Sequence, residues 1–388
     1  MTAGNPLHAL AELGQSVWLD FIRRSWLEDG TLARLIAEDD LRGMTSNPAI
    51  FEKAIASGRE YDIQIAAIAA NVSGPAPTPL AVYEQVAVTD IRQAADLLAA
   101  VYRRTHTQDG YVSLEVSPEL AEDAAGTLAE ARRLWKEVDR PNLMIKVPGT
   151  KTCLPVIRTL LAEGINVNIT LLFSRHAYAQ VAEAYLAALE ERLGKGLAVD
   201  RIASVASFFI SRIDTLVDKK IEHRAKSAPP VDRARLEALR GKIAVANAKQ
   251  AYSLFSGLFA SPRWQRLAEA GAVPQRLLWA STSAKNPAYR DVVYVEELIG
   301  RDTVNTMPPE TIDAFRDHGV ARATLAEGLT EARHQLEDLA ALGISLDAAT
   351  DELLADGVAK FVEPFRKLLG AITQRSSELV PQGRQGTR

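Results

Sequence analysis

A lysine near the end of an apolar, strand-like segment is the first residue whose type and setting indicate chemistry. Lys146 lies in the run Met144-Ile-Lys-Val-Pro-Gly-Thr150. Burial among apolar neighbours removes the hydration that stabilises an ammonium group, and a neutral lysine amine is a nucleophile towards carbonyl carbon. The alternative is a structural lysine whose head group reaches solvent at the strand end. Position alone leaves both interpretations open.

Four other polar residues fall at inward-facing positions of other expected strands, namely Asp20, Glu115, Asn168 and Thr170. Any one carboxylate beside a lysine is more often a structural ion pair than a catalytic group. Several such residues together favour function, because buried polar groups destabilise a core unless they are satisfied or used. The set around Lys146 therefore predicts a site for acid–base chemistry on a carbonyl substrate.

A second group of residues predicts phosphate binding. Arg212 ends the expected sixth strand, and Ser283 and Lys285 end the seventh, where the loops of a barrel can gather an anionic group. A surface arginine is usually only solvated, so this signal is weak by itself. We expect no metal or other cofactor, because the histidines lack ligand spacing and the sequence contains no Walker loop, dinucleotide glycine pattern or Gly-x-Ser-x-Gly elbow.

Short β-rich segments alternate with longer helical ones, a pattern that predicts parallel strands joined by crossover helices. The eight expected strands are residues 16–21, 43–48, 112–117, 142–148, 166–173, 202–211, 276–283 and 302–307. Ser117 and Ser174 are candidate N-caps for helices that end near Val138 and Gly194. Long helical stretches at 80–102 and 232–259 exceed one crossover, and 324–372 is helical again.

Alternation of side chains within the strands favours a closed (β/α)8 barrel, the TIM barrel, over an open sheet. In the fourth strand Leu143, Ile145 and Val147 share one face and Lys146 lies on the other, since residues two apart face the same way. An open doubly wound sheet is buried on both faces and has continuous apolar strands. The polar faces therefore line the lumen, and their C-terminal ends form the mouth.

Composition predicts an ordinary globular protein. The 388 residues are 47% hydrophobic and 24% charged, and 45 basic against 49 acidic residues give a net charge of −4. This balance argues against nucleic acid as a partner. We expect no membrane segment, since the apolar run at 202–210 is far shorter than the roughly 20 residues that a bilayer requires. Cys153 is the single cysteine and the start of the chain has no export signal, so we expect a cytoplasmic location.

Several motifs together resemble the transaldolase family, in its longer bacterial form. They are residues 16–21, 43–48, 112–116, 145–150, 166–174, 206–212 and 279–286. The Asn-x-Thr-Leu-Leu-Phe-Ser run and the Ile-Lys-Val-Pro run are the most specific of them. The resemblance implies one domain over 1–388, with a barrel core at about 15–310 and C-terminal helices at about 324–372. It predicts neither a monomer nor a homodimer.

The resemblance also implies roles in transferring a dihydroxyacetone unit between sugar phosphates, as in the non-oxidative pentose phosphate pathway. Lys146 is the Schiff-base lysine, Asp20 the acid–base group, and Glu115 with Thr170 handles a catalytic water. The remaining matched positions hold the dihydroxyacetone fragment or phosphate: Asn47, Asn168 and Ser207 for the fragment, and Arg212, Ser283 and Lys285 for phosphate. The best-known members have arginine at the position of Lys285. This chain therefore keeps the positive charge there, but lysine cannot make the paired hydrogen bonds of a guanidinium group to phosphate.

Two other functions are compatible with a barrel of this kind. A fructose-6-phosphate aldolase would release free dihydroxyacetone, but that group usually has glutamine at the position of Glu115, tyrosine at that of Phe209, and shorter chains. A barrel without catalytic activity, used for binding sugar phosphates or as a scaffold, predicts a lost lysine or lost lumen acids. Neither loss is seen in this sequence.

Overall fold

The structure, a computed structural model, describes residues 4–70 and 76–379. Eight parallel strands close into a barrel in sequence order, so the (β/α)8 TIM barrel predicted from the sequence is confirmed. The strands are β1 (Gln15–Asp20), β2 (Gly43–Thr45), β3 (Tyr111–Glu115), β4 (Leu143–Pro148), β5 (Val167–Leu172), β6 (Ser204–Phe209), β7 (Arg276–Ala280) and β8 (Thr303–Met307).

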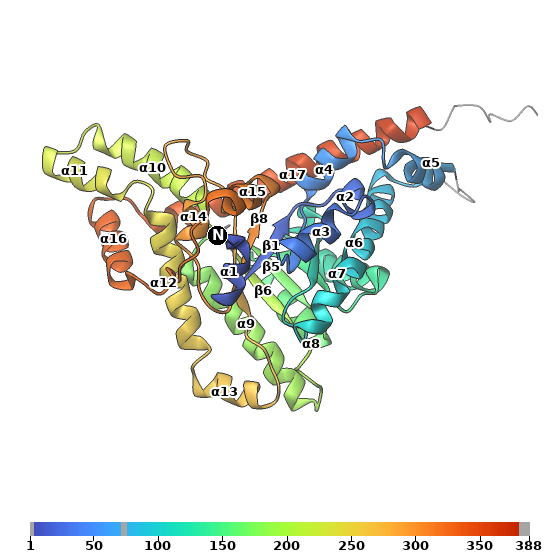
Figure 1. The fold of residues 1–388 in the computed structure, drawn as a ribbon, viewed down its shortest axis with the longest axis horizontal. Coiled ribbons are helices and arrows are strands. Elements are labelled where there is room, and N and C mark those ends of the chain that lie inside the picture. Colours follow the sequence, from blue (N-terminus) through green and yellow to red (C-terminus); the bar gives the residue numbers. More distant parts are fainter. Residues whose placement is uncertain (1–3, 71–75, 380–388) are drawn as a thin grey trace, which may run out of the picture.

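The helices surround this barrel (Figure 1). Before β4 they are α1 (Pro6–Glu12), α2 (Arg24–Glu28), α3 (Thr31–Glu38), α4 (Pro48–Ser57), α5 (Asp62–Ala70), α6 (Pro79–Arg104), the 3-10 turn η1 (Pro118–Leu120) and α7 (Ala124–Val138). Between β4 and β7 they are α8 (Leu154–Glu163), α9 (Arg175–Gly194), α10 (Ser211–Ala225), α11 (Pro230–Leu239), α12 (Ile243–Leu258) and α13 (Pro262–Glu269). The last are α14 (Val293–Glu296), α15 (Pro309–His318), α16 (Leu329–Ala341) and α17 (Leu346–Leu379). None of the described helices is long and apolar enough to cross a membrane.

The alternation predicted for the strands holds in β4, where the lysine and the apolar residues lie on opposite faces, but it breaks in β5. The register of β5 against β6 shifts between Ile169 and Leu172, and Leu171 adopts a φ of 63°. A bulge of this kind re-aims the side chains that follow it. Alternation along the sequence puts Leu171 in one row with Val167 and Ile169, and the bulge directly after Thr170 interrupts that row.

Helix boundaries differ from the prediction where a second residue nearby, and not the predicted one, caps or interrupts the helix. Ser117 caps only the turn η1, and α7 begins at Ala124, where the Asp123 side chain accepts from the Gly126 amide. The stretch 232–259 is two helices, since Gly241 between them adopts a φ of 67°, a conformation that favours glycine. Ser174 does cap α9, by accepting a hydrogen bond from the Ala177 amide at 3.1 Å.

The C-terminal segment forms α16 and then the long helix α17. Gly343, with a φ of 86°, lies in the turn between them. Helix α17 contacts α4, α5, α6, α10, the turn η1 and the strand β5. It therefore runs along the side of the barrel where the strands end (Figure 1), and it extends seven residues beyond the predicted end at 372.

Candidate active site

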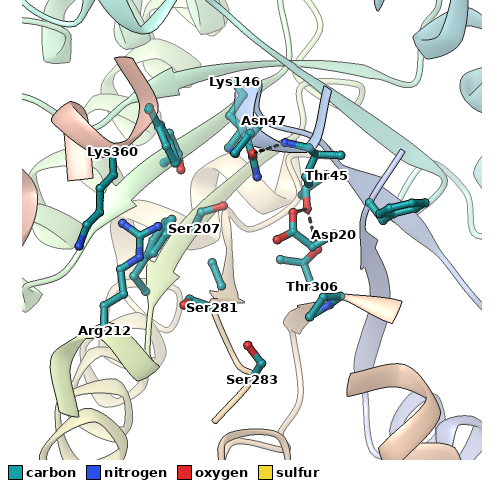
Figure 2. Close-up of a pocket in the computed structure, with 18 of the residues that line it drawn as sticks. Asp20, Thr45, Asn47, Lys146, Ser207, Arg212, Ser281, Ser283, Thr306 and Lys360 are labelled. Carbon is teal, nitrogen blue, oxygen red and sulfur yellow. Dashed lines mark hydrogen bonds between the residues drawn. The ribbon is translucent and has the colours of Figure 1, made fainter. Parts of the chain in front are cut away.

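A cavity of about 460 Å³ opens at the C-terminal ends of the strands. Eight of the ten predicted site residues line it: Asp20, Asn47, Lys146, Thr170, Ser207, Arg212, Ser283 and Lys285. Figure 2 shows several of them projecting into one space from different strands and loops. Glu115 and Asn168 are buried in the lumen beneath the cavity and do not line it.

Lys146 lies on β4 and is only 5% exposed. Its Nζ lies 3.0 Å from Glu115 Oε2 on the neighbouring strand β3 and donates a hydrogen bond to the Ser46 carbonyl at 3.1 Å. The Phe361 ring, 5.6 Å from Nζ, covers the amine. The amine is thus in direct contact with a carboxylate. A lysine attacks a carbonyl only after its amine has lost the ammonium proton, so the reaction needs an acceptor for that proton.

Glu115 is placed to be that acceptor. Burial raises the pKa of the Glu115 carboxyl, and the neighbouring Lys146 opposes this shift only in part. Apart from the ion pair, the Glu115 oxygens have no hydrogen-bond partner within the described residues, and the same holds for Thr170 Oγ1. Buried polar atoms are normally satisfied, so these atoms have free capacity for a water molecule or a substrate oxygen.

Asp20 ends β1 and faces the same cavity. Its Oδ1 accepts a hydrogen bond from Thr45 Oγ1 at 2.7 Å, and Thr306 Oγ1 lies 2.7 Å from the same hydroxyl. Burial raises the pKa of the Asp20 carboxyl despite Lys146 and Thr45, which lower it. Both threonines were missed by the sequence argument. Thr45 could have been found by aligning the two strands, because it is the residue paired with Asp20 in the β1–β2 register.

The amide side chains differ in what they leave free for a ligand. Asn168 is fully buried: its Nδ2 donates to Ser113 Oγ at 2.9 Å, and its Oδ1 accepts from Ser207 Oγ at 2.7 Å. It therefore orients Ser207, which does reach the cavity. Asn47 Oδ1 caps α4 by accepting from the Ile50 amide at 3.1 Å. This cap does not use the NH2 group of Asn47.

One side of the cavity is built for an anion. Arg212 lies in the first turn of α10, where the free backbone N–H groups of a helix favour negative charge. Its Nη1 is buried and has no hydrogen-bond partner within the described ranges, and its guanidinium stacks 5.2 Å from the Phe209 ring. Lys285 Nζ donates to Ser283 Oγ at 2.5 Å. The three predicted phosphate residues thus border one space.

Charge in the cavity has a clear sign. The lining includes five basic side chains, those of Lys53, Lys146, Arg212, Lys285 and Lys360. It includes two acidic ones, those of Asp20 and Glu310. Lys53, Lys360 and Glu310 were not predicted from the sequence. Lys360 and Phe361 come from α17, so the C-terminal helix forms part of the cavity wall.

Two tyrosine–carboxylate pairs hold α14 and the loop before it, which carries Ser283 and Lys285, against α10. Tyr294 donates to Asp214 Oδ2 at 2.9 Å, and Tyr289 donates to Asp218 Oδ2 at 2.6 Å. The other oxygen of Asp214 accepts a hydrogen bond from the Ala244 amide in the first turn of α12, and that of Asp218 accepts one from the Gly241 amide just before this helix. The anion side of the cavity is therefore fixed by buried and part-buried hydrogen bonds.

No group of three or more His, Cys, Asp and Glu side chains in the described part of the chain could hold a metal ion. A parallel barrel whose lumen holds a buried lysine–carboxylate pair, under a cavity with a basic rim, fits the class of lysine-dependent aldolases. Comparison with known proteins gives the family.

The family model described as transaldolase/fructose-6-phosphate aldolase matches residues 17–372, and the chain belongs to this family. Its curated relatives include a transaldolase of Trichodesmium erythraeum, 45% identical over 97% of this chain and 99% of the relative. Transaldolase 2 of a Nostoc strain is 47% identical over 97% of this chain and 99% of its own length. A transaldolase of Thermobifida fusca is 47% identical over 96% and 98% of the two chains.

Proposed function

We propose that this protein is a transaldolase that moves a dihydroxyacetone unit from a ketose phosphate to an aldose phosphate through a Schiff base on Lys146. The observation that carries the proposal is the Lys146–Glu115 pair, 3.0 Å apart, beneath a cavity whose lining is mostly basic. The full-length similarity to transaldolases supports it. The donors are fructose 6-phosphate and sedoheptulose 7-phosphate, and the acceptors are erythrose 4-phosphate and glyceraldehyde 3-phosphate.

The first half of the reaction forms the imine. Lys146 passes its proton to Glu115, and the free amine attacks the C2 carbonyl carbon of the donor to give a carbinolamine. Glu115, acting with Thr170 through a water molecule, returns a proton to the former carbonyl oxygen, which leaves as water. The product is a protonated imine between Nζ and C2. The raised pKa of Glu115 suits a group that takes and returns a proton.

The second half breaks and remakes a carbon–carbon bond. Asp20 takes the proton of the C4 hydroxyl, the C3–C4 bond breaks, and its electron pair moves through C2 to the imine nitrogen. The aldose phosphate leaves as an aldehyde, and an enamine of dihydroxyacetone stays on Lys146. The enamine then adds to the aldehyde of the acceptor, which receives its proton from Asp20. Addition of water to the new imine frees the lysine and the new ketose.

The other site residues bind and orient the substrate in this proposal. Arg212, Ser283 and Lys285 hold the phosphate group, with Lys285 acting as a point charge. Ser207 and the amide of Asn47 hold the hydroxyls of the three-carbon unit, and Asn168 acts on that unit by orienting Ser207. We further propose that the protein works in the cytoplasm without a metal or other cofactor.

The competing activity is an aldolase that releases free dihydroxyacetone. Fructose 6-phosphate is incubated with and without erythrose 4-phosphate, and the products are identified by mass spectrometry. We expect sedoheptulose 7-phosphate and glyceraldehyde 3-phosphate in equal amounts, formed only with the acceptor present. Stoichiometric dihydroxyacetone without acceptor would indicate the aldolase, and no turnover in either mixture would indicate a binding protein. Lys146→Met is the inactive control.

A further inference from the structure

Helix α17 places a basic side chain, Lys360, at a cavity that is otherwise lined by the barrel strands and the segments that directly follow them. Lys360 lines the cavity together with Arg212 and Lys285, and Phe361, the next residue, covers the Lys146 amine. Figure 2 shows the Lys360 side chain extending towards Arg212. The helix lies close to the barrel at this level, since a Cβ added to Gly357 would meet the Leu171 side chain at 3.0 Å.

The partner of Lys360 is a residue of its own helix. Nζ donates to Asp356 Oδ2 at 2.5 Å, one helical turn earlier, and the Lys360 side chain is 58% exposed. Exposed pairs of this kind are weak, so an anion of higher charge can displace the carboxylate. Asp356 also acts on Arg212: burial lowers the pKa of this guanidinium, and Asp356 opposes that shift.

A surface ion pair is the simplest alternative interpretation. Helix α17 contains one for comparison, because Lys367 pairs with Glu363 one turn earlier at 2.7 Å. Lys367 is 65% exposed and does not line the cavity. The two pairs share their spacing and exposure, so what distinguishes Lys360 is its place on the wall of the cavity that Arg212 also lines.

We propose that Lys360 is a further phosphate ligand of this cavity, and that Asp356 is a resident counterion which the phosphate group of the substrate displaces. The proposal deepens the function proposed above and rests on it for the identity of the substrate. A doubly charged phosphate offers more acceptor oxygens than one carboxylate, and it meets Arg212, Lys285 and Lys360 together. Binding of phosphate then ties α17 to the loops of the barrel.

Binding of inorganic phosphate tests this proposal without turnover. Its affinity is measured by titration calorimetry for the full chain and for Lys360→Met, Asp356→Asn and the matched control Lys367→Met. We expect Lys360→Met to weaken binding about three- to tenfold, because a partly exposed charge is removed. Asp356→Asn strengthens binding, because it removes the competing carboxylate, and Lys367→Met leaves it unchanged. Circular dichroism checks that each variant is folded.

The proposal is overturned if Lys360→Met binds phosphate as the unchanged protein does, if Lys367→Met weakens binding equally, or if the unchanged protein binds no phosphate. A second measurement separates it from the proposed function. Lys360→Met is expected to raise KM for fructose 6-phosphate more than it lowers kcat. Absence of transaldolase turnover, with the calorimetric pattern intact, would refute the proposed function and leave the phosphate site in place.

Discussion

Two buried carboxylic acids act on one lysine, and their surroundings give them different chemistry. Glu115 lies 3.0 Å from the Lys146 amine and has no other hydrogen-bond partner in the described residues. Asp20 instead accepts from Thr45, which in turn contacts Thr306. Burial raises the pKa of both carboxyls, as is common for groups that exchange protons with a substrate. Glu115 is thus suited to exchange a proton with the amine, because it lies next to it. Asp20 is suited to exchange a proton with the substrate, because it lies on the wall of the cavity.

The pH dependence of carbon–carbon cleavage tests the role of Asp20. Asp20 accepts the C4 proton only when ionised, so activity is lost as pH falls through its folded-state pKa, which burial places above the usual 3.8. Thr45→Val removes a hydrogen bond that lowers this pKa, and so moves the acid limb of the kcat/KM profile to higher pH. An acid limb that stays in place or moves to lower pH in Thr45→Val would contradict the assignment.

At the scale of elements, all eight strands follow from the sequence because each is a short β-rich run set between helical stretches. Helix starts are less predictable, because several residues compete to be the cap. Ser117 precedes Pro118 and matches the pattern of an N-cap, yet Asp123 caps the helix instead. In β5 the bulge at Leu171 depends on pairing with β6, which local sequence does not encode.

The site could be predicted where alternation within strands, a strand end or a family motif marks a residue. Lys146, Glu115 and Asp20 face inward by parity alone. Lys360 and Phe361 enter the cavity through the packing of α17, a helix that begins 200 residues after Lys146, so no local pattern indicates them. Conversely, parity does not reveal that both polar atoms of the Asn168 amide are already hydrogen-bonded.

The fit of α17 against the barrel is tested at Gly357. A Cβ there would meet Leu171 Cδ2 at 3.0 Å and Phe173 at 3.6 Å, so we expect Gly357→Val to push the helix outward. The free energy of unfolding should fall by about 1–3 kcal/mol, as for overpacked cores, and KM for fructose 6-phosphate should rise. Gly370→Val is the matched control, since nothing lies within 4 Å of its added Cβ. Equal effects of the two changes would refute the close fit.

At the scale of the whole molecule, charge is separated between surface and site. The chain carries a net charge of −4, yet basic side chains outnumber acidic ones in the cavity lining by five to two. A basic recess on an otherwise acidic molecule concentrates anionic ligands at the mouth, while the overall charge repels them elsewhere. The barrel thus supplies the lysine and the acids, and the loops and α17 supply the charge that selects phosphorylated sugars.

Dependence on ionic strength checks this separation. Salt screens exposed charges over about 10 Å at 0.1 M, so raising the salt concentration should increase KM for fructose 6-phosphate several-fold. KM for an uncharged donor such as fructose should change little. A salt effect of the same size on both donors would show that screening acts on the stability of the protein and not on the recognition of phosphate.

The most direct test of the covalent mechanism is mass spectrometry of the protein after borohydride reduction in the presence of fructose 6-phosphate. The account predicts a reduced three-carbon adduct on Lys146. It predicts a six-carbon phosphorylated adduct on the same lysine in Asp20→Asn, because the imine then forms without cleavage. An unlabelled Lys146, or an adduct on another lysine of the cavity such as Lys285 or Lys360, would contradict it.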